Sequence, residues 1–232
     1  MSALKPLADW FGDLPQVILM DLDGTLVDSA ADIALSLNRA LADLGLGAVT
    51  EAQVRDWVGR GAARLIEVAL QHVVPHHGQD PQKHAVETRL LAAFMARYQD
   101  SVCEASTVYP GVAEFVAAAR NAGIRLACVT NKPYRPAVAL LEALNLLDAF
   151  ELVIGGDTLA HKKPHPEPLL HCLRHFEVTA AQALMVGDSR NDVDAAKAAG
   201  VKSLALPYGY NHGEPIEDCA PDRLVASLAE LI

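Results

Sequence analysis

The sequence predicts an α/β fold, a Rossmann-like doubly wound parallel sheet with a helical cap domain inserted after the first strand. Short apolar runs at residues 17–20, 124–129 and 184–186 end at or next to a polar residue, as strands buried on both faces of a parallel sheet do. From about residue 110 such runs alternate with helical patterns, which is typical of a parallel sheet covered by helices. Between residues 28 and 108 no buried strand pattern is present, and this absence predicts the insertion.

Two weaker apolar runs, at residues 150–154 and 202–206, complete the predicted sheet. Gly123 and Gly200 stand where two of the intervening helices are expected to end, because glycine accepts the left-handed backbone of a helix C-terminus. The helices expected in this part of the chain cover about residues 112–122, 135–144, 166–175 and 191–199.

The inserted segment carries only helical patterns, and Gly59 and Gly61 interrupt the second of them. The expected helices cover about residues 30–44, 51–73 and 82–99, with a loop at residues 75–81. We therefore predict two domains, an α/β core and the helical domain inserted into it. The predicted boundaries are residues 1–28 and 109–232 for the α/β core and residues 29–108 for the helical cap.

The composition indicates a globular protein and excludes several functional classes. The chain has 232 residues, of which 51% are hydrophobic and 21% charged, enough for a substantial core. A formal net charge of −10 without any Lys/Arg run argues against nucleic-acid binding. No uncharged stretch approaches the roughly 18 residues of a membrane span, and the four scattered cysteines suggest free thiols in a reducing compartment. Because the N-terminus has no signal-peptide pattern, we expect a cytoplasmic protein. We expect it to be a monomer or a homodimer.

Polar side chains follow the predicted strands at the points where these strands end. In an open α/β sheet the carboxyl ends of the strands share one edge, where ligands bind. We therefore expect four chain segments to meet there, so that acidic, hydroxyl and cationic groups surround one ligand. The residues concerned are Asp21 and Asp23, Thr130 and Asn131, Lys163, and Asp188 and Asp192.

These residue types predict metal-assisted transfer of a phosphoryl group. Carboxylate and carbonyl oxygens suit Mg²⁺, and the candidate ligands are Asp21, the backbone carbonyl of Asp23, and Asp188. With a cation present, Asp21 can stay ionised and attack phosphorus, which forms an aspartyl-phosphate. Asp23, two residues further on, can act first as general acid and then as general base.

The other polar residues are expected to bind the phosphoryl oxygens. Thr130 and the Asn131 backbone can donate hydrogen bonds to them, and Lys163 can offset their charge in the transition state. Asp192 has three interpretations: it orients Lys163, binds the metal through water, or occupies a helical first turn, where an acid is favoured.

The four segments together resemble the motifs of the haloacid dehalogenase superfamily of phosphatases, and they occur in the order of that superfamily. Residues 21–29 are similar to its first motif, residues 129–132 to its second and residues 186–192 to its fourth. Residues 163–166 are similar to its third motif, with Lys163 as the functional lysine. The resemblance implies Mg²⁺ as cofactor, a phospho-aspartate intermediate and a mobile cap that excludes water.

Within the superfamily, residues 58–61, 130–133 and 187–192 resemble the phosphoglycolate phosphatase branch. That resemblance implies hydrolysis of 2-phosphoglycolate to glycolate and phosphate. Arg60 and Arg64 of the predicted cap are candidates for binding the substrate carboxylate, and a solvated helix face is an equal alternative. Other functions stay open: a phosphatase for a sugar phosphate or nucleotide, a β-phosphoglucomutase-like mutase, or a catalytically silent binding module.

Overall fold

A parallel sheet forms the centre of the structure, a computed structural model in which residues 4–74 and 82–232 are described. In this described part the sheet has the strand order β5-β4-β1-β6-β7-β8, and every neighbouring pair is parallel. The doubly wound α/β fold predicted from the sequence is thereby confirmed. The strands are β1 (Val17–Met20), β4 (Arg125–Val129), β5 (Leu152–Ile154), β6 (Ala183–Gly187), β7 (Lys202–Ala205) and β8 (Arg223–Leu224).

Helices cover both faces of the sheet, because successive side chains of a strand point to opposite faces. In β1, Ile18 and Met20 belong to the hydrophobic cluster on one face, and Val17 and Leu19 belong to the cluster on the other. All four β1 residues are buried, which explains why the run is uniformly apolar. The first face carries α6 (Val112–Asn121) and α7 (Tyr134–Ala143), and the second carries α8 (Glu167–His175) and α9 (Arg190–Ala199).

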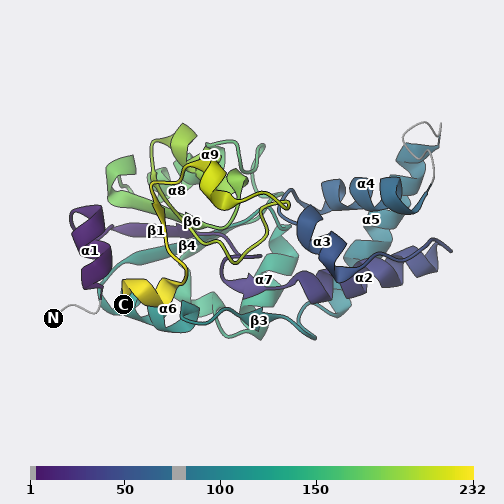
Figure 1. Cartoon of the computed structure of the whole chain (residues 1–232), viewed down its shortest axis with the longest axis horizontal. Coiled ribbons are helices and arrows are strands. Elements are labelled where there is room, and N and C mark those ends of the chain that lie inside the picture. Colours follow the sequence, from purple (N-terminus) through teal and green to yellow (C-terminus); the bar gives the residue numbers. More distant parts are fainter. Residues whose placement is uncertain (1–3, 75–81) are drawn as a thin grey trace.

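Figure 1 shows the helices of the inserted segment together at one end of the molecule, with the sheet at the other. These helices have a hydrophobic cluster of their own, which one residue from the C-terminal part of the chain, Tyr210, completes. The segment leaves and re-enters the core through a two-stranded antiparallel ladder. The helices are α2 (Ala30–Asp43), α3 (Glu51–Trp57), α4 (Ala62–Val73) and α5 (Lys83–Asp100), and the ladder pairs β2 (Val27–Asp28) with β3 (Thr107–Val108).

The interruption expected at Gly59 and Gly61 separates α3 from α4, so the predicted helix of residues 51–73 consists of two helices. Both glycines have positive φ angles, 107° and 86°, which other residues rarely adopt. The loop predicted at residues 75–81 lies outside the described residues. The exact domain boundaries stay a prediction.

Several short elements have no counterpart among the sequence predictions. The strands β2, β3 and β8 have two residues each, too few for a periodic pattern. The segment before the first strand forms α1 (Lys5–Phe11), which buries Leu7 in the cluster on the α6 and α7 face. Within the described ranges, no helix is both long enough and apolar enough to cross a bilayer.

Candidate active site

The predicted polar segments meet at the carboxyl edge of three adjacent strands. Asp21 follows β1, and its N–H donates to the Val186 carbonyl of β6 at 3.0 Å. Thr130 follows β4, and its N–H donates to the Ile154 carbonyl of β5 at 2.9 Å. Because the backbone pairing continues past the strand ends, these segments are held firmly at the edge of the sheet. A cavity of about 50 Å³ opens here, between core residues and residues of the inserted helices.

Three carboxylates, those of Asp21, Asp188 and Asp192, lie in this edge with oxygen atoms within 4.8 Å of one another. All three are buried. Burial raises the pKa of Asp21 to about 7; Lys163 opposes the rise and Asp192 adds to it. Burial, together with Asp192 and Asp21, holds the pKa of Asp188 well above its usual range. A site of buried hard oxygen atoms that repel one another fits a divalent cation such as Mg²⁺.

Lys163 lies between two of these carboxylates. Its Nζ is 3.0 Å from Asp21 Oδ1 and 2.6 Å from Asp192 Oδ1, and the side chain is buried. Burial lowers the pKa of Lys163, but Asp192 and Asp21 outweigh this effect and raise it above its usual value. Asp192 Oδ2 accepts hydrogen bonds from the Ser189 N–H and Oγ, which caps α9. Asp192 thus lies in a helical first turn and orients Lys163, as two of its three interpretations state.

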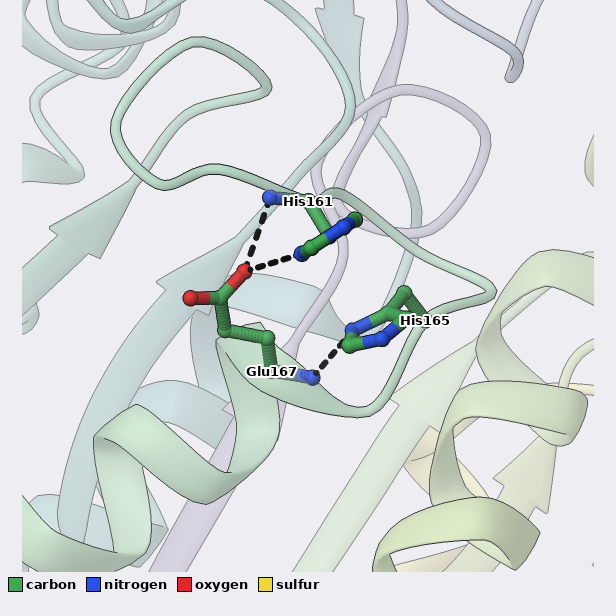
Figure 2. Close-up of side chains that lie close together, drawn as sticks. All are labelled: His161, His165 and Glu167. Atoms are coloured by element: carbon green, nitrogen blue, oxygen red, sulfur yellow. Dashed lines mark hydrogen bonds and ion pairs between the residues drawn. The ribbon is translucent and has the colours of Figure 1, made fainter.

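The loop that carries Lys163 is closed by the cluster in Figure 2, which consists of His161, His165 and Glu167. Glu167 Oε2 accepts hydrogen bonds from the His161 N–H at 2.8 Å and from its Nδ1 at 2.9 Å. The Glu167 N–H donates to His165 Nδ1 at 3.1 Å, and the two imidazole rings stack with centroids 4.1 Å apart. Because these groups bind one another at the start of α8, we interpret the cluster as support for the lysine loop.

Asp188 is fixed by contacts that the sequence reasoning missed. Its Oδ1 accepts a hydrogen bond from Thr25 Oγ1 at 2.5 Å, and its Oδ2 accepts one from the Tyr210 N–H at 2.6 Å. Gly24 and Gly209 enclose the carboxylate, since a Cβ atom on either would lie 2.3 Å from Asp188 Oδ2. The sequence offers a signal for Gly24, which lies within the first motif, but none for Gly209.

Thr130 and Asn131 occupy the edge beside Asp21, as predicted. Thr130 Oγ1 accepts a hydrogen bond from the Lys132 N–H at 3.2 Å, so its own hydrogen remains available for a ligand. The Asn131 side-chain amide donates to the Gly59 carbonyl at 2.9 Å and to the Lys163 carbonyl at 2.8 Å. Its side chain therefore joins the inserted helices to the core.

Asp23 lies apart from the three clustered carboxylates and has a cationic partner that the sequence reasoning missed. Lys132 Nζ donates to Asp23 Oδ1 at 2.9 Å and to Oδ2 at 3.1 Å. Burial lowers the pKa of Lys132, but Asp23 and Tyr98 raise it above its usual value. The position of Lys132 directly after Thr130 and Asn131 was a usable signal. The Asp23 side chain is thus paired with Lys132 and does not belong to the cluster of Asp21, Asp188 and Asp192.

Arg60 and Arg64, the predicted carboxylate-binding residues, lie apart from the other site residues. Neither lines the cavity described above. Arg60 is exposed, and its carbonyl accepts a hydrogen bond from Lys162 Nζ at 2.8 Å. The Arg64 guanidinium forms an ion pair with Glu67 at 2.6 Å on the exposed side of α4. Their predicted role in substrate binding therefore receives no support from this arrangement.

Known proteins share this arrangement. The model of the haloacid dehalogenase-like hydrolase family matches residues 18–206. A phosphoglycolate phosphatase from Nitrosococcus oceani is 44% identical over 217 residues, which cover 94% of this chain and 95% of that protein. The crystal structure of a predicted phosphoglycolate phosphatase from Haemophilus somnus superposes with a TM-score of 0.85 at 34% identity, covering 93% and 96% of the two chains.

A CbbY protein from Rhodobacter sphaeroides, solved in complex with xylulose-1,5-bisphosphate, gives a TM-score of 0.78 at 28% identity. The alignment covers 94% of this chain and 96% of that one. The family model spans all four predicted motifs, and the relatives match along almost the whole chain. The chain belongs to the haloacid dehalogenase-like hydrolase family.

Proposed function

We propose that this protein hydrolyses a phosphomonoester through an aspartyl-phosphate on Asp21, and that the substrate is 2-phosphoglycolate. The observation that carries the proposal is the buried Asp21 carboxylate, which lies 3.0 Å from Lys163 beside a cavity. A nucleophile of this kind needs a cationic neighbour, because the approaching phosphoryl group is itself negative. The name of the Nitrosococcus oceani relative supports phosphoglycolate as the substrate.

The proposed reaction has two steps, in which Asp21 and Asp23 have different tasks. In the first, an Asp21 oxygen attacks phosphorus, the bond from phosphorus to the ester oxygen breaks, and Asp23 gives its proton to the departing glycolate. In the second, Asp23 takes a proton from water, the water oxygen attacks phosphorus, and the bond to Asp21 breaks to release phosphate. Thr130 and Lys163 hold the phosphoryl oxygens throughout, which places the reacting atoms in line.

Asp21, Asp188 and the Asp23 backbone carbonyl are the proposed Mg²⁺ ligands, and Asp192 holds Lys163 beside them. Bound Mg²⁺ would neutralise charge on the transferring phosphoryl group. The fit of these residues rests on the buried oxygen cluster, in which burial and neighbouring carboxylates raise the pKa of Asp21 and of Asp188.

The helices α2 to α5 are proposed to act as a cap that keeps bulk water out of the site. The loop between α3 and α4 is bound to the core at several points. Gly59 accepts hydrogen bonds from the Asn131 and Asn191 side chains, at 2.9 and 3.2 Å, and Lys162 donates to the next residue. These contacts support a closed position in which an unreacted aspartyl-phosphate is shielded.

The proposal is tested by phosphate release from 2-phosphoglycolate with and without Mg²⁺. Asp21→Asn is expected to abolish turnover, whereas the same change at Asp148, an exposed residue far from the cavity, keeps it. Asp23→Asn is expected to accumulate phosphorylated enzyme with p-nitrophenyl phosphate, whose leaving group needs no proton, and mass spectrometry after acid quench detects it. Full activity of Asp21→Asn would exclude the proposed nucleophile.

A further inference from the structure

We propose that Lys132 and Tyr98 bind the carboxylate of the substrate and so restrict the enzyme to phosphate esters of very short hydroxy acids. This inference rests on the proposed phosphatase function and deepens it. It assigns the recognition of the acid to two residues that line the cavity rather than to the candidates Arg60 and Arg64.

Lys132 is the only cationic side chain among the described residues that line the cavity. Its ammonium group has three N–H donors, and Asp23 is the carboxylate to which it donates. The side chain is only 4% exposed, so its charge acts in a region of low dielectric, where a second anion is bound strongly. A substrate carboxylate that enters this cavity would therefore contact the ammonium group of Lys132.

Tyr98 supplies a second donor. Tyr98 lines the cavity, and the proton of its buried hydroxyl has no acceptor among the described residues. Burial raises the pKa of Tyr98 to about 12, so the hydroxyl keeps its proton and can donate it. The ring packs on Phe94 with centroids 5.6 Å apart and lies 4.5 Å from Lys132 Nζ. An unpaired buried hydroxyl costs free energy, and a bound carboxylate oxygen would remove that cost.

The distance from Lys132 to the reacting atoms selects a short acid. Asp23 must hydrogen-bond the ester oxygen in order to protonate it, and Lys132 hydrogen-bonds Asp23 at 2.9 Å. Lys132 Nζ therefore lies within two hydrogen-bond lengths, roughly 6 Å, of the ester oxygen. In phosphoglycolate a single methylene group separates that oxygen from the carboxylate, so the carboxylate falls within reach of the ammonium group.

The rest of the cavity disfavours a sugar. Its walls include Ile33, Val58, Leu65 and Phe94, none of which can pair with a hydroxyl group. The cavity volume is only about 50 Å³, and Asp21 and Thr130, where the phosphoryl group would bind, belong to the same lining. A sugar would place several hydroxyl groups against this apolar wall without partners, which costs binding free energy.

The test compares two substrates that differ only in the carboxylate. Ethyl phosphate carries a methyl group where 2-phosphoglycolate carries the carboxylate, and steady-state kinetics are measured for both with Mg²⁺ present. For Lys132→Met we expect KM for 2-phosphoglycolate to rise about 10- to 100-fold, the range for a lost charged hydrogen bond. KM for ethyl phosphate is expected to stay within about twofold of the wild-type value. Loss of Lys132 also changes the surroundings of Asp23, and any resulting change in kcat is expected to be equal for both substrates.

Tyr98→Phe is the second variant, because it keeps the ring that packs on Phe94 and removes only the hydroxyl. We expect a smaller rise in KM, about 3- to 10-fold, again for 2-phosphoglycolate alone. Equal losses on both substrates in both variants would overturn the inference and leave the proposed function intact. A wild-type enzyme that hydrolyses ethyl phosphate as efficiently as 2-phosphoglycolate would also overturn it. Wild-type hydrolysis of neither ester would refute the proposed function together with the inference.

Discussion

Gly24→Ala tests how closely the candidate metal site depends on the backbone that surrounds Asp188. Gly24 has a φ angle of 87°, and a Cβ atom there would lie 2.3 Å from Asp188 Oδ2. To reach even 3.0 Å, the carboxylate must move by about 0.7 Å. It cannot turn away easily, because Thr25 and the Tyr210 N–H bind its two oxygens and Gly209 encloses it. A displacement approaching 1 Å at a reacting centre costs on the order of 100-fold in rate.

The substitution also strains the backbone, so a matched control is needed. Gly123 has a φ angle of 79°, and no atom of residues 4–74 or 82–232 lies within 4 Å of the position of its Cβ. Alanine at either position costs roughly 1–2 kcal/mol for the left-handed conformation, which lowers Tm by about 2–8 °C in a chain of this length. Gly123→Ala is therefore expected to lose this stability and keep its activity.

The assay is phosphate release as a function of Mg²⁺ concentration, with Tm measured for both variants. Gly24→Ala is expected to lose about 100-fold in kcat/KM and to require more Mg²⁺ for half-maximal activity. If its activity stays within a few-fold of the Gly123→Ala control, the close approach of Gly24 to Asp188 does not organise the site. If the lower Tm of Gly24→Ala is enough to explain its loss of activity, the reasoning is also refuted.

Two further predictions concern the metal and the cap. The rise in Tm that Mg²⁺ produces is expected to shrink from about pH 8 to about pH 5.5, because protons compete with the cation. Burial raises the pKa of Asp21 to about 7. In metal-free protein the protonated Asp21 therefore stabilises the folded state at low pH, and this stabilisation is lost as the pH rises through 7. An equal rise in Tm with Mg²⁺ at both pH values would contradict this prediction. Arg64→Ala is expected to change KM for 2-phosphoglycolate by less than twofold, because Arg64 pairs with Glu67 outside the cavity; a tenfold rise would restore the interpretation from the sequence.

The core of the fold was predictable because its strands are buried on both faces and therefore appear as unbroken apolar runs. The same pattern placed Asp21 and Asp188 at the ends of two strands. Because the carboxyl ends of parallel strands share one edge of the sheet, the two residues were expected to lie close together. Lys163 was predictable only through its motif, since its loop depends on contacts such as the ion pair of His161 with Glu167.

Contacts between distant segments could not be predicted. Tyr98 lies on a helix whose pattern indicates burial but not what its hydroxyl faces. Tyr210 reaches across from the C-terminal part of the chain to the start of α2, where its hydroxyl accepts hydrogen bonds from the N–H groups of Ser29 and Ala30. Arg60 and Arg64 illustrate the converse, because residue type suggested a role in a cavity that neither residue lines. Side-chain direction across a domain contact depends on packing, which one sequence does not display.

The central position of β1 governs how this chain can fold during synthesis. Its two neighbours in the sheet, β4 and β6, begin more than 100 residues later. When the ribosome has made β1, its backbone groups and apolar side chains have no partner, and they must wait for both flanking strands. The helices α2 to α5 contact mainly one another and can gather first, although their cluster then lacks Tyr210. The nucleophilic Asp21 is thus among the first site residues made, and its surroundings are complete only after residue 192 has left the ribosome.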